Sequence, residues 1–189
     1  MLDRFRYVHL ARKVVGVGSV GTRAWILLLV GNDVSDPLIL QVKEAGPAVL
    51  EPFLGESEFT NHGERVVHGQ RLMQSASDIL LGWISTHGID GVDRDFYVRQ
   101  LWDGKASAPI ETMIPRGMTA YAEACGWTLA RAHARSGDAV AIASYLGGGD
   151  TFDQALASFA ELYADQNERD YAALVHAAET GRITATPGL

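Results

Sequence analysis

The stretch from Arg12 to Ala45 decides the fold, and it reads RKVVGVGSVGTRAWILLLVGNDVSDPLILQVKEA. It holds three runs rich in apolar, branched side chains, at Lys13–Val17, Ala24–Val30 and Leu38–Val42. A glycine-rich segment separates the first two runs, and turn-forming residues at 32–37 separate the last two. Short apolar runs bounded by turn formers are typical of β-strands. The stretch therefore predicts a three-stranded antiparallel meander with a glycine-rich turn between its first two strands.

The glycine-rich turn has two interpretations. Gly16, Gly18 and Gly21 surround Ser19, and Lys43 ends the third run. Bare N–H groups in such a turn can approach a phosphate, while a nearby ammonium group neutralises its charge. Alternatively, the turn is an ordinary hairpin whose glycines adopt positive φ, and Lys43 points into water. Spacing alone leaves both interpretations open.

Composition limits the classes of function. The chain has 189 residues and a formal net charge of −7, which argues against nucleic acid or an anionic membrane as the main partner. No apolar run reaches transmembrane length, and the N-terminus lacks the apolar core of a signal peptide, so we expect a cytoplasmic protein. The single cysteine, Cys125, lies in an apolar helical pattern and is expected to be buried and reduced.

The rest of the first half completes the sheet. Apolar residues recur at helical spacing over Gly63–Leu80, with Val66, Gly69, Met73, Ala76 and Leu80 on one stripe. Gly82–Ser85 and Asp95–Leu101 have strand patterns and are joined by a polar turn. We therefore expect an α+β fold, with an antiparallel five-stranded sheet lobe that carries one helix. The expected domains are a sheet-rich half at residues 1–102, a linker at 103–116 and an all-helical half at 117–189.

The helical half is expected to contain several separate helices. A long helix from Gly117 to about Gly137 has Gly126 in its middle, which costs about 1 kcal/mol relative to alanine. Close packing of a neighbouring element at Gly126 would compensate for that cost. Thr151 opens a later helix, and Asn167 is expected to cap a further one.

Other chemistries find little support in the sequence. The six histidines show no helical metal-ligand spacing with a third ligand nearby, and no G-x-S-x-G motif is present. His133 could gather with Arg131, Arg135 and Asp138 at a helix end, since all four lie within the string LARAHARSGD. The alternative for this string is a solvated helix face.

Several long strings resemble a known bacterial family. These are RKVVGVGSVGTR, LQVKEA, VVHGQRLMQSASD, FYVRQLWDGK and WTLARAHARSGD, and they occur in this order along nearly the whole chain. They resemble the family catalogued as domain of unknown function 2252. Its members are usually longer, and this chain resembles their C-terminal part. The resemblance implies little about activity, because the family is uncharacterised.

The order of elements is also similar to that of protein kinases and aminoglycoside phosphotransferases. In that comparison the Gly16–Gly21 turn corresponds to the loop over the phosphates, and Lys43 to the lysine that pairs the α- and β-phosphates. The helix would supply Glu64 or Gln70 beside Lys43, and Arg99–Trp102 would be the hinge whose backbone contacts adenine. This resemblance implies binding of ATP with magnesium by Gly16, Gly18, Ser19, Gly21, Arg23, Lys43, Glu64, Gln70 and Arg99.

The catalytic residues of such enzymes cannot be assigned here. After the long helix the chain reads SGDAVAIA, without the asparagine or the second metal-binding aspartate that kinase-like catalysis uses. Longer family members carry strings resembling GDxHxxNFG and NDFD, which would fit a permuted kinase-like arrangement, and this sequence contains neither.

Two hypotheses about the function stay open. One is a nucleotide-binding, phosphotransferase-like domain completed by an upstream half or a partner chain. The other is a non-catalytic interaction module, a remnant of a split gene. If an upstream half normally covers this one, apolar surface is exposed in its absence, and a homo-oligomer or an unstable monomer is expected.

Overall fold

The computed structural model describes residues 2–13, 16, 21–101 and 107–186 of the chain. It consists of two compact units, Met1–Asp138 and Ala139–Leu189. The first unit holds the whole sheet and the helices α1, α2 and α3, and the second holds the helices α4 and α5. An antiparallel sheet followed by a helical region is the α+β class that the sequence predicted.

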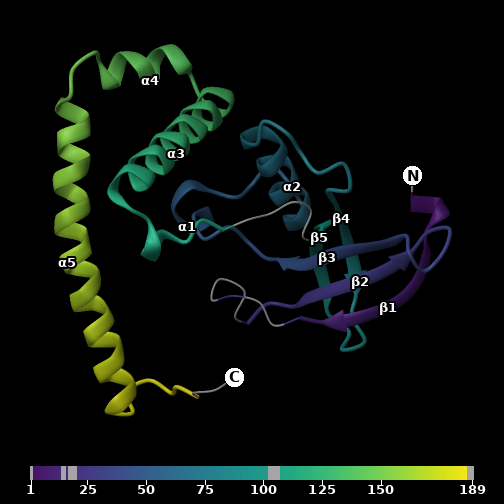
Figure 1. Cartoon of the computed structure of the whole chain (residues 1–189). Helices are drawn as coiled ribbons and strands as arrows, with labels where there is room; N and C mark the ends of the chain where they lie inside the picture. Colours follow the sequence, from purple (N-terminus) through teal and green to yellow (C-terminus); the bar gives the residue numbers. More distant parts are fainter. Residues whose placement is uncertain (1, 14–15, 17–20, 102–106, 187–189) are drawn as a thin grey trace. The chain divides into compact units, whose positions relative to one another are not determined.

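The sheet is a five-stranded antiparallel meander with one insertion (Figure 1). Its order is β1-β2-β3-β5-β4, so the last strand along the chain lies between β3 and β4. The strands are β1 (Arg6–Arg12), β2 (Ala24–Val30), β3 (Pro37–Ala45), β4 (Gly82–His87) and β5 (Asp93–Gln100). The prediction of five antiparallel strands is confirmed.

The first strand lies earlier in the chain than predicted. β1 covers Arg6–Arg12, whereas the sequence pattern placed the first strand at Lys13–Val17, with Tyr7, Val8 and Leu10 able to extend it. The register explains the difference: Arg6 lies opposite Val30 and Arg12 opposite Trp25, so nearly all of β2 is paired before Lys13 is reached. Residues 14, 15 and 17 of the predicted strand lie outside the described part of the chain.

The helix α2 (His62–Met73) is fixed to the sheet at its N-terminus. Asn61 caps the helix, because its Oδ1 accepts a hydrogen bond of 2.8 Å from the Glu64 backbone N–H. The Asp95 carboxylate on β5 accepts three more, from His62 N at 2.8 Å, Asn61 Nδ2 at 2.9 Å and Ser85 Oγ at 2.7 Å. One carboxylate therefore joins the helix start to two strands.

The helix ends seven residues earlier than the predicted Leu80. Beyond Met73 the Asp78 side chain organises a turn: its Oδ1 accepts from Leu80 N at 2.8 Å and its Oδ2 from Gln100 N at 2.6 Å. A short side chain that bonds nearby backbone N–H groups favours a turn over a helix. The predicted apolar stripe is also wrong. The side of α2 that faces the sheet carries Gly63 and Val67, while Gly69, Met73 and Ala76 are exposed.

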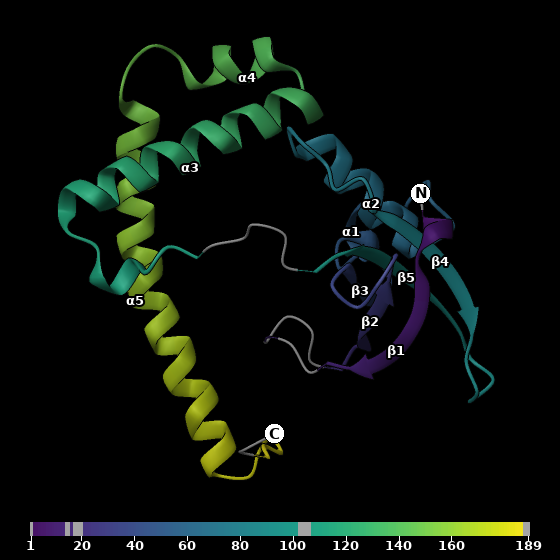
Figure 2. The ribbon, with the colours of Figure 1, turned by 45° about the vertical axis from the view of Figure 1, so that its right-hand side comes forward.

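The remaining elements of the first unit are short, except for α3 (Pro115–Ser136). They are α1 (Glu51–Leu54) and two 3₁₀ turns, at Leu2–Arg4 and Ile110–Thr112. The C-terminal part of α3 meets the end of α2 (Figure 2), where the Arg135 guanidinium donates to the carbonyls of Leu72 and Met73.

Two predictions about α3 are wrong. Apart from the backbone of α3 itself, no heavy atom of the described residues lies within 4 Å of a Cβ placed at Gly126, so none of the described elements packs closely there. The predicted burial of Cys125 is also wrong: its side chain is exposed, and the only buried residue of α3 is Ala132. The apolar pattern of this helix therefore faces solvent over most of its length.

The second unit contains α4 (Ala139–Leu146) and α5 (Thr151–Glu179). The prediction of a new helix at Asn167 is wrong, because α5 is one helix of 29 residues that runs through this position. Ala177 is its one buried residue, and its apolar side chains at helical spacing are exposed, including Phe152, Leu156, Phe159 and Tyr163. None of the helices in the described residues has the length and apolar character needed to cross a membrane.

Candidate functional site

The face of the sheet that α2 covers can be identified from the register. Directly paired residues of antiparallel strands point to the same face. The row Ala24, Lys43, Tyr97 and Trp83 runs across β2, β3, β5 and β4. His68 of α2 lies over Trp83, with ring centroids 5.7 Å apart, so this row is on the α2 side of the sheet. We call this side the helix-covered face.

Lys43 lies on the helix-covered face next to the end of the glycine-rich turn. It is half-buried, and its cross-strand partner on β2 is Ala24, three residues after Gly21. Lys43 therefore lies at the same end of the β2–β3 pair as the exit of the turn. The arrangement brings the predicted lysine and the exit of the predicted turn together, although they are separated by 22 residues in sequence.

The glycines at the two ends of this segment have the positive φ that the ordinary-hairpin interpretation predicted. Gly16 has φ +53° and Gly21 has φ +84°, both in the left-handed region that glycine adopts without strain. Among the described residues outside its chain neighbours, a Cβ at either position would meet no atom within 4 Å, so the positive φ is the observed reason for glycine there. Gly18 and Ser19 lie outside the described residues.

A second pair on the helix-covered face links β3 to β5. Gln41 and Arg99 are cross-strand partners, two pairs along from Lys43 and Tyr97 and therefore on the same face. The Gln41 Oε1 atom accepts hydrogen bonds from Arg99 Nε at 3.1 Å and from Arg99 Nη2 at 3.0 Å. Gln41 is 4% exposed. The amide therefore fixes the direction of the guanidinium within the sheet.

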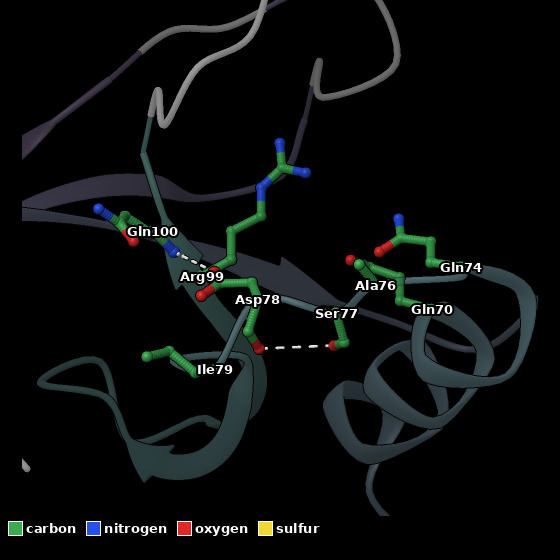
Figure 3. Close-up of a pocket in the computed structure, with 8 residues that line it drawn as sticks. All are labelled: Gln70, Gln74, Ala76, Ser77, Asp78, Ile79, Arg99 and Gln100. Carbon is green, nitrogen blue, oxygen red and sulfur yellow. Dashed lines mark hydrogen bonds between the residues drawn. The ribbon is translucent and has the colours of Figure 1, made fainter.

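A cavity of about 440 Å³ lies beside Arg99, between β5, the end of α2 and the turn that follows it (Figure 3). Arg99 and Gln70 both line it, so the structure brings these two predicted residues together. The other lining residues are Gln74, Ala76, Ser77, Asp78, Ile79 and Gln100. Three glutamine amides and one guanidinium give this cavity a wall rich in hydrogen-bond donors.

Two of the predicted site residues have partners elsewhere. The Glu64 carboxylate lies 3.7 Å from His68 Nε2, one turn further along α2. Arg23 precedes Ala24 and lies on the opposite face, where its Nη1 is 3.2 Å from Glu44 Oε2 and its Nη2 is 3.5 Å from Asp90 Oδ2. The structure therefore does not bring Arg23 to the face that carries Lys43.

The opposite face holds a network of four charged residues. Arg94 is 2.6 Å from Asp90 and 3.7 Å from Glu44, which adds to the two contacts of Arg23. The hydrogen bond from Arg94 holds the pKa of the Asp90 carboxyl well below its usual range. These pairs stabilise the β4–β5 hairpin, and their charges largely cancel.

The predicted hinge offers few free backbone donors. Gln100 N donates to Asp78 Oδ2 at 2.6 Å, and Leu101 N donates to the Ile39 carbonyl at 2.9 Å. Trp102 lies outside the described residues. A base contacting this strand would therefore find the N–H groups of Gln100 and Leu101 already used within the fold.

The polar cluster predicted at the end of α3 has a structural explanation for two members. Arg135 bonds the last carbonyls of α2, and the Arg131 guanidinium stacks on the Trp127 ring, 4.5 Å from its centroid. Within the described ranges, no group of three or more His, Cys, Asp or Glu side chains is arranged to hold a metal ion.

Sequence reasoning missed Gln41, Asp78 and Asp95, although each has a visible signal. Gln41 is the one polar residue inside the apolar run Leu38–Val42. Polar side chains in buried strands generally have a hydrogen-bond partner, so this position signals one. Asp78 lies in the turn before β4 and Asp95 near the start of β5, and short carboxylates commonly bond nearby backbone N–H groups at such positions.

Comparison with known proteins identifies the family. The family described as "Uncharacterized protein conserved in bacteria (DUF2252)" matches residues 1–177, and the chain belongs to it. No curated protein and no solved structure matches the sequence.

Proposed function

We propose that this chain is a nucleotide-binding, phosphotransferase-like domain that binds the phosphates of ATP and needs a second, catalytic half to transfer one. The observation that supports the proposal best is the position of Lys43. The register places it opposite Ala24, at the exit of the glycine-rich turn and on the face that α2 covers. A glycine-rich segment beside an ammonium group is a combination that can bind phosphate.

The local environment of Lys43 suits an anionic ligand. A half-buried ammonium interacts more strongly with a phosphate than one in bulk water, because the effective dielectric constant is lower. Tyr97, its partner on β5, is also half-buried, and burial raises the pKa of this phenol above 10.0 while the Arg99 charge opposes the shift more weakly. A neutral Tyr97 hydroxyl can donate a hydrogen bond to the same ligand.

The proposal assigns binding to this chain and catalysis to another segment. The described residues near Lys43 offer no set of carboxylates that fits a magnesium ion, so the metal would enter with the nucleotide. No aspartate base followed by a metal-binding asparagine can be named in the sequence. The GDxHxxNFG-like half would have to come from an upstream segment or a partner chain. An adjacent reading frame encoding that half would support this division.

Calorimetric titration with ATP and magnesium tests the proposal. Replacing Lys43 by alanine or methionine removes a charge-assisted contact, which is worth about 1.5–3 kcal/mol, or one to two orders of magnitude in affinity. Arg116→Ala is the control, because it removes one positive charge from an exposed position on α3. Absence of binding to the wild type, or equal binding to the Lys43 variants, would show that Lys43 is an ordinary sheet lysine.

A second candidate function is a non-catalytic interaction module. The exposed apolar face of α5 favours it, because a long helix with one buried residue needs a covering surface to be stable in water. Sedimentation of the full chain distinguishes the two. Self-association without nucleotide binding supports the interaction module, whereas a monomer that binds ATP supports the first proposal alone.

A further inference from the structure

The buried pair Gln41 and Arg99 has a feature that a structural cross-link does not require. Gln41 is the one buried polar residue among those described, and its carbonyl oxygen holds two nitrogens of the Arg99 guanidinium. A glutamine amide is neutral, so it orients the guanidinium and leaves its positive charge uncompensated. A glutamate at position 41 would make the same hydrogen bonds and cancel the charge.

No other group in the described residues cancels the charge of Arg99. The two hydrogen bonds of its side chain both go to Gln41, and no described carboxylate lies within 4.0 Å of its nitrogens. Figure 3 shows the guanidinium pointing away from Asp78, the acidic residue that lines the same cavity. Arg23 and Arg94, on the opposite face, differ in that both are paired with carboxylates.

Arg99 and Lys43 lie diagonally across the β3–β5 pair on the same face. Lys43 pairs with Tyr97 and Arg99 pairs with Gln41, two residues along each strand. Diagonal neighbours of an antiparallel pair have Cα atoms about 7–8 Å apart, which long side chains easily span. Two cations at this spacing can contact successive groups of one extended anion.

We propose that Arg99, positioned by the buried Gln41, is a second phosphate-binding residue beside Lys43, and that the site takes a di- or triphosphate chain in preference to a single phosphate. This inference rests on the proposed phosphate-binding role of Lys43. Arg99 contacts the ligand directly, whereas Gln41 acts through Arg99 and is a positioning residue. A guanidinium suits this role because it keeps its charge and offers several N–H groups in a fixed plane.

The test uses calorimetric titration of the full chain with inorganic tripolyphosphate, pyrophosphate and orthophosphate. The wild type should bind tripolyphosphate at least ten times more tightly than orthophosphate. Arg99→Gln should weaken tripolyphosphate binding about 10- to 100-fold, because one charge-assisted contact is lost. Arg131→Gln, which removes a charge from the exposed surface of α3, should leave the affinity unchanged.

The role of Gln41 is tested by Gln41→Glu, which keeps the acceptor and neutralises Arg99. Tripolyphosphate binding should weaken to the level of Arg99→Gln, while orthophosphate binding changes less than threefold. A purely structural link predicts unchanged affinity in Gln41→Glu, provided that circular dichroism shows a native fold. Should that variant fail to fold, Arg99→Lys decides the question. This variant keeps the charge without the planar fork, and it should bind tripolyphosphate more tightly than Arg99→Gln does.

The outcomes separate this inference from the proposal on which it rests. If the wild type binds no phosphate compound, both are overturned. If Lys43→Ala loses tripolyphosphate while Arg99→Gln binds it as the wild type does, the role of Lys43 stands and the role of Arg99 is refuted.

Discussion

The contact between α2 and β5 can be tested at Gly63, because the helix backbone comes so close to the strand there. A Cβ at this position would lie 2.3 Å from the Phe96 carbonyl oxygen and 2.7 Å from its carbonyl carbon. Both atoms belong to the backbone of a paired strand, so neither can move away as a side-chain tip would. Gly63→Ala therefore forces α2 and β5 apart by about 1 Å to reach ordinary contact distance.

The size of the effect follows from two opposing contributions. Overpacking of a tight contact costs about 1–3 kcal/mol, and here it also stretches the hydrogen bonds of Asp95 to Asn61 and His62. Alanine gains up to about 1 kcal/mol over glycine in a helix. We expect Gly63→Ala to lower the free energy of unfolding by about 1–2 kcal/mol.

Gly69→Ala is the matched control on the same helix. Gly69 is exposed, and a Cβ there would meet nothing within 4 Å, so only the helix propensity changes. This variant should be more stable than the wild type by about 0.5–1 kcal/mol. Urea unfolding followed by tryptophan fluorescence measures both. A Gly63→Ala variant as stable as Gly69→Ala would show that α2 does not pack against β5 in this way.

Two further predictions concern the same unit. Asp95→Ala should lower the free energy of unfolding by about 3 kcal/mol, because three hydrogen bonds to one carboxylate are lost, whereas Asp93→Ala, at a side chain that is 83% exposed, should change it by less than about 0.5 kcal/mol. Equal effects in urea unfolding would contradict the anchoring role of Asp95. Burial raises the pKa of the Tyr97 phenol, so its contribution to stability is complete below pH 10.0 and is lost as the pH rises through the native pKa. Tyr97→Phe should remove this alkaline loss, and an unchanged pH profile of unfolding would refute it.

The strands were largely predictable because their signals are local. The runs at β2 and β3 are short, apolar and bounded by turn formers, and β5 has an alternating strand pattern, so these features specify strands without knowledge of the rest of the chain. The first strand was misplaced because Arg6–Arg12 has a weaker apolar pattern than Lys13–Val17. Its pairing with β2 is a long-range fact that the local sequence does not contain.

The helices were harder to predict because their ends depend on distant partners. α2 stops at Met73 since Asp78 bonds the backbone of Gln100, 22 residues further along. α5 continues through Asn167, which is a moderate helix former and not a breaker in a helix interior. The burial of Val67 in place of the predicted stripe is set by how the Asp95 anchor rotates the helix on the sheet.

The residues of the candidate site were partly predictable from the sequence, but the pairing of Gln41 with Arg99 was not. Lys43 and the flanking glycines could be named from the sequence, because a glycine turn near a strand lysine is a recognisable local pattern. Gln41 could not be assigned a partner from the sequence, since Arg99 lies 58 residues away and only the register joins them.

Stability alone does not account for the Gln41–Arg99 pair. Intramolecular hydrogen bonds replace bonds to water, so each contributes about 0.5–1.5 kcal/mol net, and two apolar side chains of the same shape can serve as well. A buried neutral acceptor that orients a guanidinium without cancelling its charge instead preserves an attraction for anions. Since the same face presents Lys43 beside the glycine-rich turn, binding of an extended anion accounts for both features together.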